Sequence, residues 1–203
     1  KAEVLALPTN RGKAEAVRIG MLHAQTSAWP GTPPSVGFLD GDGSIGLADI
    51  TRLSGLLRDH RSRDTADAVW SSRVLLAGRD VRRSTLRHLI GRAISTLVSL
   101  GHPEVPYDTQ SGFKLFAPSA TLTACLGSPF RTRWLFELEL LNRWRVAAHR
   151  HLRVWEEPLG AWHAVGGSRV TLRESPRIAR ELLFIKRDQR RTRRLVASWP
   201  GTE

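Results

Sequence analysis

The chain has 203 residues, 41% of them hydrophobic, with a single cysteine and a formal net charge of +12. This length and apolar content fit one domain with an ordinary core, and one cysteine excludes an internal disulfide. The sequence has no apolar run near the roughly 20 residues that span a membrane, and its charge indicates an anionic partner such as nucleic acid, an acidic membrane surface or a phosphate-bearing substrate.

The first predicted elements are a short strand at residues 4–7 and a helix at 13–25, joined by a loop. Apolar residues recur at helical spacing in the second segment. Lys13 and Arg18 therefore lie where a strand gives way to a helix, and the N–H groups at a helix start bind anions. The glycine spacing and the Lys-Ser/Thr pair of a Walker motif are missing, and a solvated basic helix start explains the same residues.

An apolar run ends in two closely spaced carboxylates in the stretch 36–44. Asp40 and Asp42 follow a predicted strand of four residues and are separated and followed by glycines. Carboxylate oxygens are ligands that Mg²⁺ and Mn²⁺ prefer, and glycine lets the backbone approach a bulky ligand closely. The sequence D-G-D-G is also ordinary turn chemistry, so both interpretations stay open from these residues alone.

Helices and strands alternate through the next segments. We expect a helix at 47–57, a strand at 66–72 that runs into Arg73, a charged loop at 80–84 and a helix at 84–100. This alternation predicts an α/β fold with a mostly parallel sheet flanked by helices.

A dense group of polar residues precedes an aromatic and aliphatic run at residues 107–116. Asp108, Gln110 and Lys114 in this stretch suit a pocket wall better than a core strand. After a short helix at 118–126, another helix opens at 134–141 and carries Glu137 and Glu139. These two acids point in different directions, so we expect one of them to face the interior, where a carboxylate requires a partner.

The last predicted elements are a strand at 154–159, a loop at 163–169 and a helix at 175–194. The helix is basic and amphipathic, with Leu182, Leu183 and Ile185 among its arginines. One interpretation places this helix on a membrane surface. The other packs its apolar face on the sheet and leaves its charges in water.

The order of these motifs closely resembles family 2 glycosyltransferases of the dolichyl-phosphate glucose and mannose synthase type, and the glucose type is the closer match. Its most specific parts are the strings D-T-Q-S-G-F-K-L-F and W-L-F-E-L-E-L-L. The matching stretches are residues 10–18, 40–43, 71–73, 108–116, 134–141, 157–158 and 168–170. The sequence departs from the family pattern at Ala14 and Ser71, which replace glycines, and at Glu137, which replaces an aspartate.

The resemblance implies a GT-A fold and inverting transfer of a hexose from a nucleotide sugar, UDP-glucose or GDP-mannose, to a polyprenyl or dolichyl phosphate. It also implies Mg²⁺ or Mn²⁺ held by Asp40 and Asp42. Because two phosphates must be held in line, cationic side chains are expected around them. The residues assigned in this way are Asp42, Asp108, Arg73 and Lys114 for catalysis, Lys13, Arg18, Asp40, Gln110 and Glu139 for the donor, and Arg73, Lys114, Ser168 and Arg169 for the acceptor phosphate.

Two strand motifs that hold the base and ribose in this family are missing, so we expect a fragment of an active enzyme. Residues 1–174 are expected to form the glycosyltransferase domain without its N-terminal part, and residues 175–203 a basic amphipathic helix and tail. The expected location is peripheral, at the cytoplasmic face of a membrane. A saccharide acceptor and a non-catalytic truncated relative stay open as alternatives. A nucleic-acid-binding module is disfavoured because no recognition motif accompanies the charge.

Overall fold

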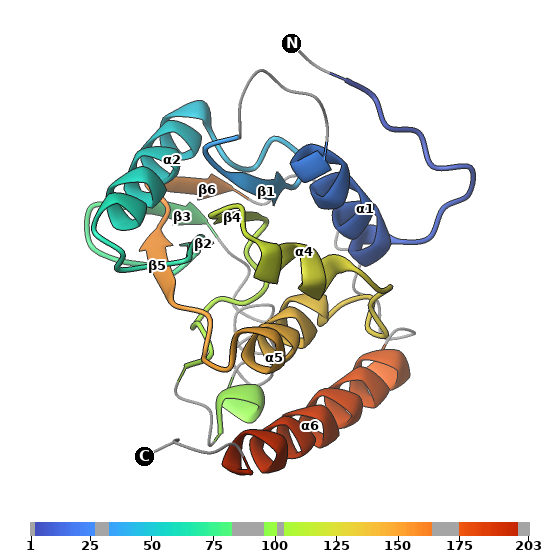
Figure 1. Cartoon of the computed structure of the whole chain (residues 1–203). Coiled ribbons are helices and arrows are strands. Elements are labelled where there is room, and N and C mark those ends of the chain that lie inside the picture. Colours follow the sequence, from blue (N-terminus) through green and yellow to red (C-terminus); the bar gives the residue numbers. More distant parts are fainter. Residues whose placement is uncertain (1–2, 27–32, 83–95, 101–103, 164–174, 199–203) are drawn as a thin grey trace.

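The computed structural model describes residues 3–26, 33–82, 96–100, 104–163 and 175–198. Its helices are α1 (Lys13–Thr26), α2 (Leu47–Ser62), α4 (Ala120–Leu126), α5 (Phe136–Ala148) and α6 (Ser175–Ala197). Its strands are β1 (Val36–Leu39), β2 (Ala68–Ser72), β3 (Asp80–Arg82), β4 (Phe113–Phe116), β5 (Val154–Pro158) and β6 (Ala161–His163). Figure 1 shows the strands between α2 on one side and α1, α4 and α5 on the other.

The main sheet has four strands in the order β1–β4–β2–β5, and β3 pairs with β6 in a separate parallel ribbon. Strand β4 runs antiparallel to both β1 and β2, whereas β2 and β5 are parallel. The α/β class is confirmed, but the expectation of a mostly parallel sheet is only partly met: β1, β2 and β5 run in the same direction, yet two of the three pairings in the sheet are antiparallel. Helix α2 does connect β1 to β2, yet β4 lies between these two strands. The alternation of elements along the chain does not reveal such an insertion.

The reversed strand brings residues that are distant in sequence to one edge of the sheet. Leu39 pairs with Phe113, and Ser72 pairs with Pro158. The C-terminal ends of β1, β2 and β5 therefore meet the N-terminal end of β4. Gly37 allows β1 and β4 to approach, because a Cβ at this position would overlap the carbonyl oxygen of Lys114.

Side chains along the strands alternate between two apolar clusters, one on each face of the sheet. Trp70 and Phe116 face α1, α4 and α5, whereas Val69 and Leu115 face α2. Cys125 lies in the first cluster, where burial raises the pKa of its thiol to about 12. The thiol therefore stays protonated and behaves as an apolar core residue.

Two predicted elements differ from the structure. Residues 4–7 form no strand, because no strand in the described part of the chain pairs with them to take their backbone hydrogen bonds. Residues 80–82 form strand β3 instead of a charged loop, because their backbone pairs with β6. The predicted helix at 84–100 and the predicted loop at 163–169 lie mostly outside the described residues, although 96–99 are helical.

Helix α6 packs on α5 rather than on the sheet (Figure 1). Ile185 is fully buried in a cluster with Leu138 of α5, and Leu182 packs against it. Leu183, by contrast, is exposed. The interpretation that the apolar face of α6 is packed is correct, but this face packs on α5 and not on the sheet. Ile185 is therefore not available to a membrane. No helix in the described ranges is both long enough and apolar enough to cross a membrane.

A carboxylate of α6 also holds the start of α5. Glu181 accepts hydrogen bonds from the backbone N–H groups of Arg133, Trp134 and Leu135 at 2.9–3.1 Å. A negative charge at a helix N-terminus satisfies N–H groups that have no partner inside the helix and is favoured by the helix dipole. The position of α6 is therefore coupled to the position of the first turn of α5.

Asp67 provides a test of how β2 and β5 are joined at their N-terminal ends. Its carboxylate accepts from Arg150 at 2.6 and 2.8 Å and from the backbone of Arg153 at 2.9 Å. Burial alone would raise the pKa of Asp67, but the hydrogen bonds from Arg150 and Arg153 lower it to about 2. Because the folded pKa lies below the unfolded value of about 3.9, the contribution is present above pH 4 and is lost as the pH falls towards 2.

We expect Asp67→Asn to lower the free energy of unfolding by about 1–2 kcal/mol at pH 7, since the two arginines are partly exposed. The difference should shrink as the pH falls below about 4. Urea unfolding at a series of pH values measures it. Asp59→Asn, at an exposed site of α2, is the control and should show little difference at any pH. A difference for Asp67→Asn that stayed constant down to pH 3 would contradict this account.

Candidate functional site

Most of the expected site residues gather where β1, β2 and β5 end and β4 begins. Asp40 follows β1, Arg73 follows β2, and Lys114 is the second residue of β4. Lys13 opens α1, and Glu137 lies in the first turn of α5. The charges of Asp40 and Glu137 act on the pKa of Arg73, and those of Lys13 and Glu137 act on the pKa of Lys114, so these side chains lie within electrostatic range of one another.

Asp40 is held in place from two sides. The Nζ of Lys13 lies 2.7 Å from Oδ1 of Asp40 and 5.5 Å from the ring centroid of Phe38. Gly112 lies against the same carboxylate, because a Cβ at this position would be 2.5 Å from Oδ2 of Asp40. The side chain of Asp40 is 34% exposed. Glycine at 112 therefore leaves room for a carboxylate that still reaches solvent.

Asp42 lies in the exposed turn that follows. Its Oδ1 accepts a hydrogen bond from the N–H of Ser44 at 3.0 Å. Burial alone would raise the pKa of Asp42, but the hydrogen bonds from Ser44 and the charge of Lys13 hold the pKa below its ordinary value. The carboxylate is therefore ionised at neutral pH. Asp42 therefore stabilises the turn and also presents an accessible carboxylate of the kind that binds a cation.

Asp40 and Asp42 fit the donor set of a hard cation that also binds phosphate. In the described part of the chain, no group of three or more His, Cys, Asp or Glu residues is placed to hold a metal ion. Mg²⁺ commonly takes one or two protein carboxylates and completes its shell with water and substrate phosphates. Two accessible carboxylates meet that requirement, and Lys13 beside them adds a cation for a phosphate oxygen.

Arg73 is fixed by a two-point contact with Asp108. Its Nε and Nη2 donate to the two oxygens of Asp108 at 2.8 and 2.7 Å, and its backbone N–H donates to Oδ2 at 2.9 Å. Glu156 holds Asp108 in turn by accepting from its backbone N–H at 2.7 Å. Burial alone would lower the pKa of Arg73, but the hydrogen bonds with Asp108 raise it. The guanidinium is thus a permanent charge in a defined orientation.

Trp162 covers the same guanidinium, a contact that the sequence does not indicate. The Cζ of Arg73 lies 5.3 Å from the centroid of the Trp162 ring, within the range of a cation–π interaction. The turn before Trp162 is held by Asp49 of α2, whose two carboxylate oxygens each lie 3.0 Å from the backbone N of Gly160. An aromatic residue shortly after the Glu157-Pro158 motif is the only sequence signal, and it does not indicate which cation the ring meets.

Lys114 and Glu137 form a buried pair beneath this edge. Their side chains are 0% and 2% exposed, and Nζ of Lys114 lies 3.4 Å from Oε1 of Glu137. Nζ also donates to the carbonyl of Ser111 and lies 5.2 and 5.0 Å from the ring centroids of Phe38 and Trp70. Burial lowers the pKa of Lys114 and raises that of Glu137. The ammonium of Lys114 is therefore not presented at the surface.

Known proteins are similar to this sequence over most of its length. A Saccharomyces cerevisiae protein named dolichyl-phosphate beta-glucosyltransferase is 27% identical over 194 residues, which cover 90% of this chain and 54% of that protein. Proteins of the same name from Drosophila melanogaster and Homo sapiens are 32% and 28% identical over 173 and 202 residues. The chain is related to the dolichyl-phosphate beta-glucosyltransferases. The resemblance to family 2 glycosyltransferases, and to the glucose type in particular, is confirmed.

The matches cover 84% and 98% of this chain for the fly and human relatives, but only 49% and 57% of those proteins. The chain spans about half the length of the curated relatives it matches. No family model matches the chain.

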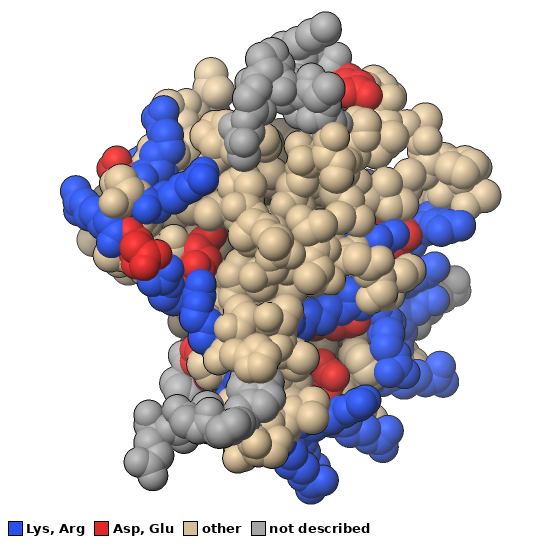
Figure 2. Space-filling view, in the orientation of Figure 1, with Lys and Arg blue, Asp and Glu red and all other residues tan. Residues whose placement is uncertain are grey.

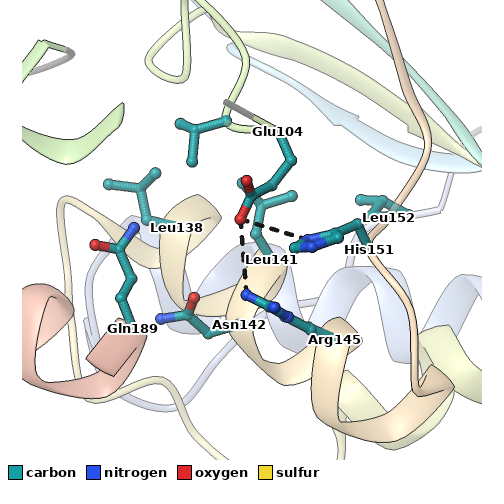
Figure 3. Close-up of a pocket in the computed structure, with 9 residues that line it drawn as sticks. Glu104, Leu138, Leu141, Asn142, Arg145, His151, Leu152 and Gln189 are labelled. Atoms are coloured by element: carbon teal, nitrogen blue, oxygen red, sulfur yellow. Dashed lines mark ion pairs between the residues drawn. The ribbon is translucent and has the colours of Figure 1, made fainter. Parts of the chain in front are cut away.

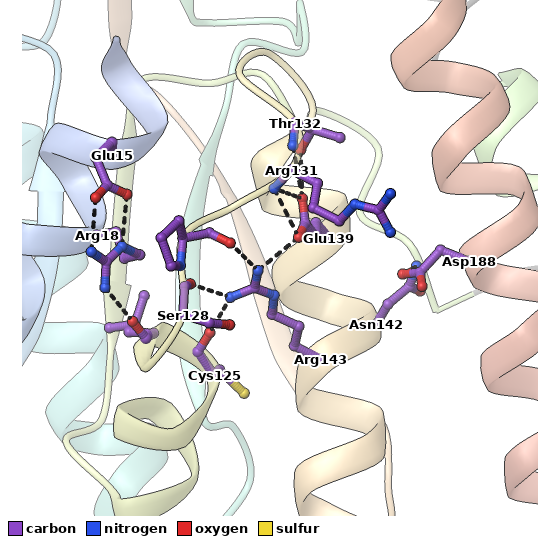
Figure 4. A network of polar contacts seen from close by, with 12 residues as sticks. Glu15, Arg18, Cys125, Ser128, Arg131, Thr132, Glu139, Asn142, Arg143 and Asp188 are labelled. Atoms are coloured by element: carbon purple, nitrogen blue, oxygen red, sulfur yellow. Dashed lines mark hydrogen bonds and ion pairs between the residues drawn. The ribbon is translucent and has the colours of Figure 1, made fainter. Parts of the chain in front are cut away.

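Arg18, expected on the donor side, is engaged in packing contacts between α1 and α4 (Figure 4). Its Nε and Nη2 donate to Glu15 at 2.7 and 2.8 Å, and its Nη1 donates to the carbonyl of Leu126 at 2.8 Å. The hydrogen bonds with Glu15 raise the pKa of Arg18. Arg18 therefore connects two helices and does not project towards Asp40.

Glu139 also has a full set of partners from the protein. It accepts from the backbone N–H groups of Arg131 and Thr132 at about 3.0 Å and from Nη2 of Arg143 at 2.8 Å (Figure 4). We expected one of Glu137 and Glu139 to face the interior, and in the structure both are buried. Each has a different cationic partner, so their opposite directions are as expected.

The remaining expected residues are Gln110, Ser168 and Arg169. Gln110 is half-buried, and its Nε2 has no hydrogen-bond partner among the residues that the structure describes. Ser168 and Arg169 lie outside the described residues.

An enclosed pocket between α5 and α6 is too small for a substrate (Figure 3). Its volume is about 10 Å³, which is room for about one water molecule. Oε1 of Glu104 lies 3.4 Å from Nδ1 of His151 and 3.9 Å from Nη1 of Arg145 across this space. None of the residues at the sheet edge lines the pocket, so the candidate site is the open edge itself.

Proposed function

We propose that the protein transfers glucose from UDP-glucose to dolichyl phosphate or another polyprenyl phosphate, with inversion at the anomeric carbon. One observation carries the proposal. A single sheet edge presents two accessible carboxylates, Asp40 and Asp42, together with Lys13 and the oriented guanidinium of Arg73. A reaction between two phosphate-bearing substrates requires this combination of a cation site and fixed positive charges. The names of the relatives support the same reaction.

On the donor side, Asp40 and Asp42 would hold Mg²⁺ or Mn²⁺. When bound, such a cation neutralises the negative charge that develops on the departing nucleoside diphosphate. Lys13 binds a diphosphate oxygen through a charge-assisted hydrogen bond and leaves Asp40 to the metal. The unpartnered Nε2 of Gln110 donates to a sugar hydroxyl. Arg18 and Glu139 support this side by holding α1 and the loop before α5.

On the acceptor side, the lipid phosphate is already an anion, so it needs no strong general base. Arg73 orients this phosphate, Asp108 keeps the guanidinium in position, and Ser168 and Arg169 add further contacts. A phosphate oxygen then attacks the anomeric carbon while the bond from that carbon to the diphosphate oxygen breaks. The electron pair of the broken bond leaves with UDP. Lys114 and Glu137, buried beneath the sheet edge, act as positioning residues for Phe38 and β4.

The lipid chain of the acceptor lies in a bilayer, so the protein acts at a membrane surface. We assign the cytoplasmic face, because the anionic lipids of that leaflet attract a protein whose net charge is +12. No nucleic acid takes part in the proposed reaction.

The test uses the complete gene product that carries this chain, because the chain spans about half of its relatives. The protein is incubated with labelled UDP-glucose or GDP-mannose and dolichyl phosphate, with Mg²⁺, with Mn²⁺ or with a chelator. We expect lipid-soluble label from UDP-glucose, loss of transfer with the chelator and recovery with either metal. Unphosphorylated dolichol is the control and should accept no sugar. Preference for GDP-mannose, or transfer to a saccharide but not to the lipid phosphate, would contradict the proposal.

A further inference from the structure

The outward face of α6 carries a continuous row of arginines. We call Arg180, Arg187, Arg190, Arg191 and Arg194 the basic stripe; all five are exposed. Their spacing of three, four and seven residues places them on one side of the helix. Figure 2 shows Lys and Arg side chains gathered at the lower right of the molecule, where α6 runs in Figure 1.

The acidic residues of α6 face the opposite way. Glu181 holds the start of α5, and Asp188 accepts a hydrogen bond from Asn142 of α5 at 2.8 Å. Among the residues that the structure describes, no ion pair joins an arginine of the basic stripe to a carboxylate. Burial lowers the pKa of Lys186, and the charges of Arg190 and Arg193 lower it further. The positive charge of the outer face is therefore crowded and not neutralised within the described fold.

Apolar side chains lie on the same face as the basic stripe. Leu183 is 59% exposed and Leu195 is 42% exposed. Leu195 also lines a shallow groove of about 410 Å³ together with Arg187, Arg190, Arg191, Arg194 and Ser198. At the surface of a lipid bilayer, leucine side chains can enter the acyl-chain region while neighbouring arginines bind the headgroups. A helix face that combines leucines and arginines is therefore stabilised at that surface.

We propose that the basic stripe, with Leu183 and Leu195, docks the protein on an anionic membrane surface. A nucleic acid would satisfy the arginines but offers no apolar layer for the two leucines, so the combination favours a bilayer. The position of α6 suits this role, because Glu181 ties the helix to the first turn of α5, which carries Glu137 at the candidate site. Docking through α6 therefore orients the sheet edge relative to the bilayer that holds the acceptor.

This docking surface gives the proposed function its location, but it is tested without any sugar nucleotide, so the two proposals can fail separately. The 203-residue chain is mixed with sedimentable vesicles of phosphatidylcholine alone or with about one third phosphatidylserine. We expect binding to the anionic vesicles only, weakened by added salt. In the triple variant R187Q/R191Q/R194Q, the apparent affinity should fall on the order of 100-fold, because each basic residue near an anionic surface raises the affinity about fivefold.

The matched control is R58Q/R61Q/R63Q, which removes the same three charges from exposed positions at the end of α2. Since α2 covers the other face of the sheet, this variant should bind as the unchanged chain does. Removing like charges from α6 relieves repulsion, so a folding defect is not expected, and circular dichroism checks it. Equal binding by the two variants, equal binding to neutral vesicles, or tighter α6-dependent binding to a nucleic-acid duplex than to anionic vesicles would each overturn the proposal.

Discussion

Asp42→Asn is expected to lower the rate of metal-dependent glucosyl transfer by at least roughly 100-fold, while the fold stays intact. The turn should survive, because the side-chain oxygen of asparagine still accepts the hydrogen bond that Ser44 donates at 3.0 Å. The change removes only the negative charge that a divalent cation needs. Initial rates across a Mg²⁺ titration measure the effect on transfer, and urea unfolding measures the effect on the fold.

Asp59→Asn is the matched control for this experiment. Asp59 is exposed on α2, away from the sheet edge, and its replacement removes the same charge. Its transfer rate and Mg²⁺ dependence should equal those of the unchanged protein. If Asp42→Asn kept both the rate and the Mg²⁺ dependence, Asp42 would be a turn residue alone and the cation site would lie elsewhere.

Local elements were predictable because their signals are local. The helical spacing of apolar residues placed a helix at 13–25, and α1 spans Lys13–Thr26. The apolar run before Asp40 predicted a strand, and β1 ends at Leu39. The direction and neighbours of β4 were not predictable in this way. They depend on contacts with β1 and β2, which lie far away in the sequence.

For the candidate site, the sequence indicated suitable residue types but not which of their charges are already paired. Asp40 and Lys13 lie together as their motifs indicated. Arg18 and Glu139 carry suitable groups, yet neighbouring side chains and backbone groups satisfy them. Whether a charge faces a ligand or a neighbour is decided by tertiary packing. A sequence motif specifies the type of residue at a position, but it does not specify which group that side chain contacts in the fold.

Some supporting residues had no signal of their own. Glu156 holds the backbone of Asp108, and Glu181 holds the start of α5 from a separate helix. Each is an ordinary acid in the sequence, and its role depends on backbone N–H groups contributed by another segment. Trp162 acquires its role because the β5–β6 turn places its ring against Arg73.

The buried pair of Lys114 and Glu137 leads to the largest expected effect on stability. Lys114→Met should lower the free energy of unfolding by about 3–5 kcal/mol, because it removes one partner and leaves Glu137 as an isolated carboxyl group in the interior. Methionine has a similar volume and can pack between Phe38 and Trp70, so the loss does not arise from a cavity. Urea unfolding at neutral pH measures the change.

The double variant Lys114→Met/Glu137→Leu separates the charge effect from packing. With both charges removed, no unpaired charge stays buried, and most of the lost stability should return; the carbonyl of Ser111 still loses the hydrogen bond that Lys114 donates. A double variant as unstable as Lys114→Met alone would show that shape, rather than charge, maintains this layer. If the stability returns but glucosyl transfer does not, the pair acts on the reaction through its field on Asp40 and Arg73. That outcome would assign the pair an electrostatic role in addition to its positioning of Phe38 and β4.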